Sequence, residues 1–168
     1  MNHPSTTALI LALLLTLTLS LTSCAHETTA DDILNAMCQS QNSLPAGQIY
    51  HSQAAPGEKE FADAELRSVL FGKTAETDWE IINHFAFRLS TAGTPHEFAV
   101  FVCVSAQDAY DIAKMCLRRS DILRRGYADT AWAEMSENAQ ICVSGRYVLM
   151  AVGEAAADAI DAGRRAMR

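Results

Sequence analysis

Charged side chains are missing from the beginning of this chain. The first acidic residue is Glu27 and the first basic residue is Lys59, so Met1 to Thr7 carries neither Lys nor Arg. The formal net charge of -7 therefore belongs entirely to the residues after Cys24. An acidic domain of this kind repels nucleic acid and has no broad electrostatic attraction to an anionic membrane. We therefore expect no nucleic-acid partner.

The sequence also lacks the short motifs that carry familiar chemistry. It contains no C-x-x-C, H-E-x-x-H, G-x-S-x-G or P-loop. Ser144-Gly145 precedes a predicted strand, whereas a nucleophile elbow requires a helix there. No metal-ligand spacing relates the histidines that follow Cys24, which are His26, His51, His84 and His96. We predict that the protein is not an enzyme, with no cofactor and no metal site.

The amino-terminal segment has the features of an export signal. Ala8 to Leu21 is apolar and uncharged, and it is shorter than the ~20 residues that a membrane-spanning helix needs. Leu21-Thr22-Ser23-Cys24 then resembles a bacterial lipobox, in which an aliphatic and two small residues precede the cysteine that takes diacylglycerol. We predict a signal peptide over 1–23, lipidation of Cys24, and a short tether over 24–30 that holds the domain at the extracytoplasmic side of the cell membrane.

Two other interpretations of this segment stay open. The missing Lys or Arg before Ala8 departs from the usual positive start of a signal, and the segment could instead be an ordinary cleaved signal or an uncleaved anchor helix. The sequence does not decide between single-membrane and double-membrane bacteria.

Apolar periodicity divides residues 31–168, which are predicted to form one domain. Helices are expected over 31–41, 61–71, 105–125 and 154–167; strands are expected over 81–90, 97–104, 139–143 and 146–152, with a short one near 48–51. Ser105 is the predicted N-cap of the longest helix, with Asp108 three positions on. The connection over 127–138 is polar and is expected to be partly helical.

The order of these elements predicts the fold class. After two amino-terminal helices it runs strand, strand, helix, strand, strand, helix, which indicates an α+β domain with a mainly antiparallel sheet and helices packed on one face. Ser144-Gly145 is the expected two-residue turn of the second hairpin, in a register that pairs Ile141 with Val148 and Ala139 with Met150.

The other sheet face is expected to be apolar as well. Phe101, Cys103, Tyr147 and Leu149 are predicted to point there, although an exposed sheet face is normally polar. Two explanations stay open: the amino-terminal helices cover this face, or Phe101, Tyr147 and Leu149 form a surface for a protein or small-ligand partner.

Arginines gather near the end of the longest predicted helix, at Arg118, Arg119, Arg124 and Arg125. They either complement the helix dipole in solvent or contact lipid headgroups or an acidic partner. Four further cysteines follow Cys24, namely Cys38, Cys103, Cys116 and Cys142. Because an extracytoplasmic compartment permits disulfides, they are either paired or small buried apolar residues, and Cys103 and Cys142 are expected on one sheet face.

Several of these features together resemble a known family. The lipobox, the Glu97-Phe-Ala-Val-Phe strand, the helix with Ala109 and Arg118-Arg119, and the Gly145-Arg-Tyr-Val-Leu-Met strand resemble small lipoproteins of anaerobic Gram-positive bacteria that carry domain of unknown function 4358. The resemblance covers the chain from about Asp31 onward. It implies a location and a layout but no activity, because none is assigned to that family.

The expected function is that of a membrane-anchored, non-catalytic domain that binds a protein or a small ligand outside the cell. A hydrolase or redox enzyme with a site assembled from distant residues is the main alternative, and a passive structural lipoprotein is a third.

Overall fold

The computed structural model describes residues 28–72 and 79–168. The predicted signal over 1–23 and the predicted lipid attachment at Cys24 lie outside the described residues. The helices are α2 (Ala30–Gln39), α3 (Ala64–Phe71), α5 (Asp108–Tyr127), α6 (Ala133–Glu137) and α7 (Ala156–Ala166). The strands are β1 (Gly47–His51), β2 (Ile82–Ser90), β3 (Glu97–Cys103), β4 (Gln140–Ser144) and β5 (Tyr147–Val152).

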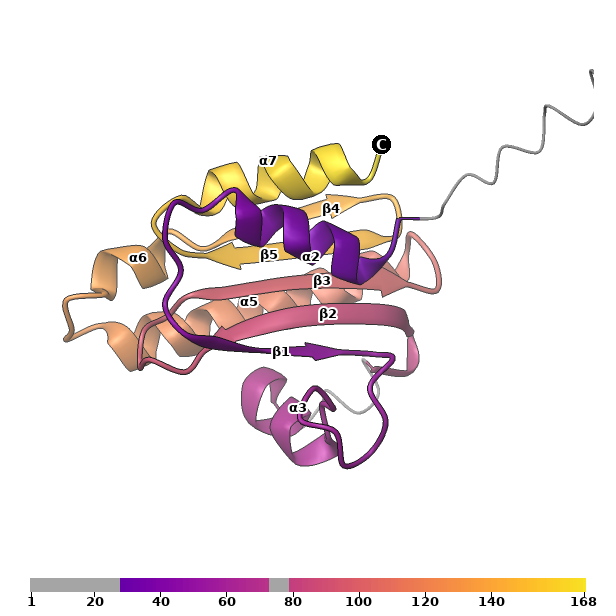
Figure 1. The fold of residues 1–168 in the computed structure, drawn as a ribbon, viewed down its shortest axis with the longest axis horizontal. Helices are drawn as coiled ribbons and strands as arrows, with labels where there is room; N and C mark the ends of the chain where they lie inside the picture. The colour runs from indigo at the N-terminus through magenta and orange to yellow at the C-terminus, as the bar shows by residue number, and fades with distance from the viewer. Residues whose placement is uncertain (1–27, 73–78) are drawn as a thin grey trace, which may run out of the picture.

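The strands form one five-stranded sheet in the order β1-β2-β3-β5-β4, and every neighbouring pair is antiparallel (Figure 1). This confirms the predicted α+β class, the antiparallel sheet and the two hairpins. β3 and β5 occupy the interior of the sheet because their residues are apolar on both faces. All of β3 is buried, as a strand covered on both sides must be.

The helices lie on both faces of the sheet, in contrast to the expected single face. α5 and α3 pack on the face that carries Phe87 and Phe101, whereas α2 and α7 pack on the face that carries Val100 and Leu149. β3 and β5 present apolar side chains on both faces of the sheet. A single layer of helices would leave half of these side chains in water, so the fold covers both faces.

Hydrogen bonds between side chains and nearby backbone stabilise the starts of α2 and α5. Thr29 and Asp32 form a capping box at the start of α2, with the Asp32 N–H donating to Thr29 Oγ1 at 3.1 Å. Ser105 and Asp108 form the same reciprocal pair of hydrogen bonds just before α5. The predicted pairing of these two residues is therefore correct, but the N-cap of α5 is Gln107 and not Ser105, because the helix begins at Asp108.

The β4–β5 hairpin differs from the expected register by two residues. Ile141 pairs with Met150 and Val143 with Val148, and the two loop residues are Gly145 and Arg146. Gly145 has a φ of 56°, and a glycine with positive φ suits the first position of such a loop. A shift of two residues keeps every side chain on its expected face, so the packing is unaffected.

Candidate functional site

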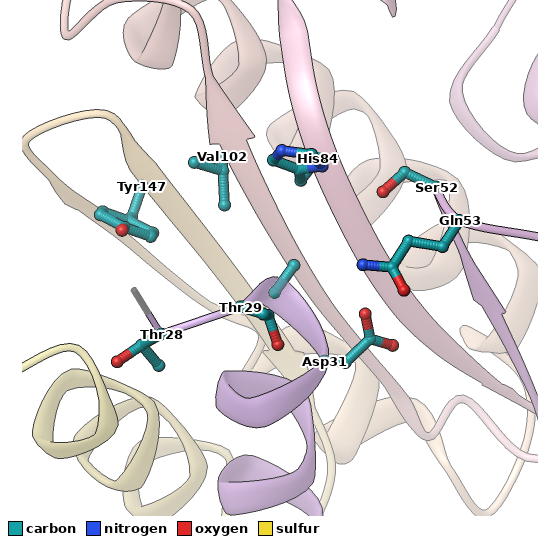
Figure 2. Close-up of a pocket in the computed structure, with 9 residues that line it drawn as sticks. Thr28, Thr29, Asp31, Ser52, Gln53, His84, Val102 and Tyr147 are labelled. Carbon is teal, nitrogen blue, oxygen red and sulfur yellow. The ribbon is translucent and has the colours of Figure 1, made fainter. Parts of the chain in front are cut away.

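A small cavity opens at the end of the sheet where α2 begins (Figure 2). It has a volume of ≈ 100 Å³. Its walls come from Thr28, Thr29, Ala30, Asp31, Ser52, Gln53, His84, Val102 and Tyr147. The cavity is therefore assembled from segments that lie far apart in the sequence.

Strand pairing brings the floor of the cavity together. Val102 of β3 pairs with His84 of β2 on one side and with Tyr147 of β5 on the other. The three side chains share the face that α2 covers, and Val102 is buried while Tyr147 is half-buried. Ser52 and Gln53 follow the last residue of β1 and close one side.

The polar groups of the wall are available to a ligand. Among the described residues, no hydrogen bond joins the side chains of Asp31, Ser52, Gln53, His84 and Tyr147 to one another. His84 and Ser52 are exposed. The cavity thus offers hydroxyl, amide, imidazole and carboxylate groups to a small polar ligand, or to one side chain of a larger partner.

His96 lies at the opposite end of the sheet. It is 6% exposed, its Nδ1 is 2.9 Å from Thr94 Oγ1, and its ring meets Trp132 at 6.1 Å between centroids. Burial lowers the pKa of His96 from its ordinary value, while the carboxylate of Glu154 raises it and Arg88 lowers it further. These contacts make His96 a packed side chain of the interior.

The expected partner surface of Phe101, Tyr147 and Leu149 does not form. Phe101 pairs with Val148 and faces α5, whereas Leu149 faces α2 and α7, so the two side chains lie on opposite faces. Both are 0% exposed. The prediction combined the two faces because it did not fix the register between β3 and β5. Tyr147 alone reaches a solvent-accessible site, which is the cavity.

The arginines of α5 have different environments. Arg119 makes a two-pronged contact with Glu97 of β3, with distances of 3.0 Å from Nε to Oε1 and 2.7 Å from Nη2 to Oε2. The side chains of Arg119 and Glu97 are only 12% and 3% exposed. Arg124 is exposed and pairs with Asp121 at 3.0 Å. Arg119 is therefore an internal ion-pair partner and does not take part in the headgroup contact that was one of the two alternatives for this cluster, whereas Arg118, Arg124 and Arg125 are exposed.

The cysteines occupy separate places. Cys38, Cys103, Cys116 and Cys142 are all free thiols. Cys103 faces α5 and Cys142 faces α2 and α7, so the expectation of a shared sheet face is wrong. Burial raises the pKa of Cys103 to about 12 and also raises the pKa values of Cys38 and Cys116. A thiol with a raised pKa is a poor nucleophile, which suits the apolar packing role that was one of the two alternatives.

Within residues 28–72 and 79–168, no group of three or more His, Cys, Asp or Glu side chains is placed to hold a metal ion. No helix in these same ranges has the length and apolar character needed to span a membrane. Comparisons with protein-family models, curated proteins and solved structures give no match.

Proposed function

We propose that this chain is a lipoprotein anchored to the extracytoplasmic side of a bacterial membrane by lipid on Cys24, and that its domain is a non-catalytic binding or accessory module. The observation that carries the proposal is Leu21-Thr22-Ser23-Cys24 at the end of an apolar, uncharged run. A thioether-linked diacylglycerol supplies the two acyl chains that stable anchoring requires. The resemblance to lipoproteins with domain of unknown function 4358 remains a prediction that agrees with this proposal.

The start of the folded domain supports the same interpretation. Thr28, the first described residue, follows Cys24 by four positions, and the capping box at Thr29 begins α2 directly afterwards. A lipid on Cys24 therefore holds the domain close to the bilayer. The cavity lies at this end of the domain, so its ligand would be bound near the membrane surface.

Palmitate labelling of the full chain in a bacterial host tests the anchor. We expect the natural chain to take up label and to fractionate with membranes, and Cys24→Ala to do neither. Cys142→Ala is the matched control, because it removes a half-buried thiol and leaves the lipobox intact. An unlabelled cytosolic chain, or undiminished labelling of Cys24→Ala, contradicts the proposal.

A photo-crosslinking residue in place of Gln53 tests the binding role in the anchored protein. Gln53 is exposed at the rim of the cavity, whereas Asp121 is exposed on α5 away from it. We expect crosslinks to a defined product from position 53 and none from position 121. Equal products from both positions contradict binding at the cavity.

One observation favours a hydrolase as the second candidate. Ser52, His84 and Asp31 line the same cavity, and these residue types make up nucleophile–base–acid triads. Within the described part of the chain, no hydrogen bond links the three side chains. Ester hydrolysis that disappears in both Ser52→Ala and His84→Ala would replace the binding proposal.

A further inference from the structure

Two helices of this protein end in the same charge pattern. α5 contains Asp121-Ile-Leu-Arg124-Arg125, and α7 contains Asp161-Ala-Gly-Arg164-Arg165. In each helix the aspartate pairs with the first arginine, at 3.0 Å in α5 and 3.9 Å in α7. The arginines of both patterns are exposed. Local charge therefore does not distinguish the two helix ends, and only their positions in the fold do.

The basic end of α7 lies where the chain enters the domain. α2 and α7 pack antiparallel, because Gln41 Nε2 donates to the carbonyl of Ala155 at 3.1 Å, while Gly163 lies against Met37. The last turn of α7 is therefore beside the first turn of α2. Figure 1 shows the C-terminus close to this point, and Figure 2 shows α7 next to Thr28.

The basic end of α5 lies at the opposite end of the molecule. Arg119 binds Glu97, the first residue of β3, whereas Val102 near the other end of β3 lines the cavity together with Thr28. A strand rises about 3.4 Å per residue, so Glu97 is roughly 17 Å farther from the chain entrance than Val102. Arg124 and Arg125 lie more than one helical turn beyond Arg119 along α5, and so still farther from the chain entrance.

The basic ends of α5 and α7 differ in how near they can come to the membrane that holds the lipid, and therefore in how strongly its charge acts on them. The backbone from Cys24 to Thr28 can span at most roughly 14 Å, and charges interact strongly with a surface only within a Debye length of about 8 Å. The arginines of α7 can come within this range while the anchor holds. Asp31 and Asp32 lie at the same end and reduce the attraction, and Asp32 is already engaged by Thr29.

We propose that Arg164 and Arg165 in the last turn of α7, together with the exposed Arg168 just after it, contact the anionic headgroups of the membrane that holds the lipid. This inference rests on the proposed lipidation of Cys24 and adds the face of the domain that meets the bilayer. It assigns the headgroup contact to α7 in place of the arginines of α5. With α7 toward the bilayer, the end of the domain that contains His96, Trp132 and α6 points away from it.

Arginine modification by phenylglyoxal, measured by peptide mass spectrometry, tests this orientation. The lipidated chain from the host is placed in vesicles of phosphatidylcholine alone or of equal parts phosphatidylcholine and phosphatidylglycerol. We expect Arg164, Arg165 and Arg168 to react roughly three- to tenfold more slowly on the anionic vesicles, with unchanged rates at Arg124 and Arg125. Equal rates on the two vesicles, or protection confined to α5, overturn the inference.

A matched pair of variants provides the second measurement. Arg164→Gln/Arg165→Gln removes two of the three contacts, so the protection of Arg168 on anionic vesicles should fall. Arg124→Gln/Arg125→Gln makes the same charge change in the same local pattern and should leave Arg168 protected. Identical protection of Arg168 in the two variants overturns the inference. Absent palmitate on Cys24 defeats the proposed function, whereas a labelled chain with unprotected α7 arginines defeats only this inference.

Discussion

The sheet face beneath α5 and α3 carries a cluster of aromatic rings, whereas the face beneath α2 and α7 carries mainly small and aliphatic side chains, with Phe98 as its one fully buried ring among the described residues. On the first face Phe71 meets Trp79, Phe87 and Phe101 edge-to-face, with centroids 5.8–5.9 Å apart. On the second face Gly163 lets α7 approach so closely that an added Cβ would lie 2.3 Å from Leu149 Cδ2. The interior is therefore close-packed in two ways: large rings fill the gap between the sheet and α3 and α5, whereas at Gly163 the missing side chain lets α7 lie directly against the sheet.

The two faces also differ in how they hold a buried arginine. Arg119, on the aromatic face, has a carboxylate partner in Glu97. Arg88, on the second face, donates to the carbonyl of Pro45, while its Nη1 is buried with no hydrogen-bond partner in the described structure. A buried charge is stabilising only when the loss of water is offset by partners. The sequence around each arginine does not reveal this difference: Arg88 stands between Phe87 and Leu89, Arg119 stands between Arg118 and Ser120, and the partner of each lies more than twenty positions away in the chain.

The largest expected effect comes from breaking the ion pair on the aromatic face. Arg119→Met leaves the Glu97 carboxylate buried without its partner, and it should lower the free energy of unfolding by about 3–5 kcal/mol in a urea titration. The control is Glu97→Leu/Arg119→Met, which removes both charges and should recover most of the loss. An unchanged unfolding midpoint in Arg119→Met would show that the pair contributes nothing.

A glycine substitution on the second face should have the next largest effect. Gly163→Ala forces Leu149 and Met37 to move in a packed interior, and it should destabilise the protein by about 1–3 kcal/mol. Gly126→Ala is the matched control, since no atom lies within 4 Å of its added Cβ and α5 is helical there. It should be neutral or stabilise by up to about 1 kcal/mol. Thermal unfolding midpoints of the two variants measure this difference. A similar loss in Gly126→Ala would contradict the idea that the close packing is specific to α7.

Alkaline pH should lower the free energy of unfolding of the protein through the two thiols on the aromatic face, Cys103 and Cys116. Because burial raises the pKa of Cys103 to about 12 and that of Cys116 also upward, both stay protonated in the folded state above pH 9, where unfolded cysteine ionises. Stability is therefore complete below pH 9.0 and falls as pH rises toward 12, by at most about 1.4 kcal/mol per pH unit for each thiol. Urea midpoints against pH measure this slope, and Cys103→Ala/Cys116→Ala should flatten it.

The smallest effect is expected at the other buried arginine. Arg88→Met loses one hydrogen bond to Pro45 but also removes the unpartnered Nη1, so the free energy of unfolding should change by less than about 1 kcal/mol. A loss as large as that of Arg119→Met would mean that the two faces hold their arginines equally well, and the contrast between them would disappear.

Local patterns predicted the elements whose signals are short-range. The short apolar run over 97–104 predicted β3, and the Ser105–Asp108 pair predicted the turn that leads into α5. The second hairpin was predicted with its strands on the correct faces but two residues out of register. Turn chemistry fixes such a register, and Gly145 fits both Ser144-Gly145 and Gly145-Arg146 as the loop.

The candidate site was less predictable than the elements around it. His84 and Tyr147 were singled out from the sequence, but neither was connected with Thr28, Ser52 or Gln53. Those three residues lie outside the strands, and they line the cavity only because the pairing of β2, β3 and β5 brings its floor next to them. A headgroup contact was one of two alternatives for the arginines of α5, which are dense in the sequence. The position of α7 beside the chain entrance depends on its packing against α2, which the sequence does not reveal.

The sequence by itself determined the α+β class, which residues within each strand share a face, and the expectation of an anchor at Cys24, because periodicity and short motifs act over a few residues. Tertiary structure decided which arginine is buried in an ion pair, which helix covers each face, and which basic helix end lies beside the tether. The physical reason is that these outcomes depend on contacts between residues distant in the chain, such as Glu97 with Arg119 and Gln41 with Ala155, whose partners only the folded packing selects.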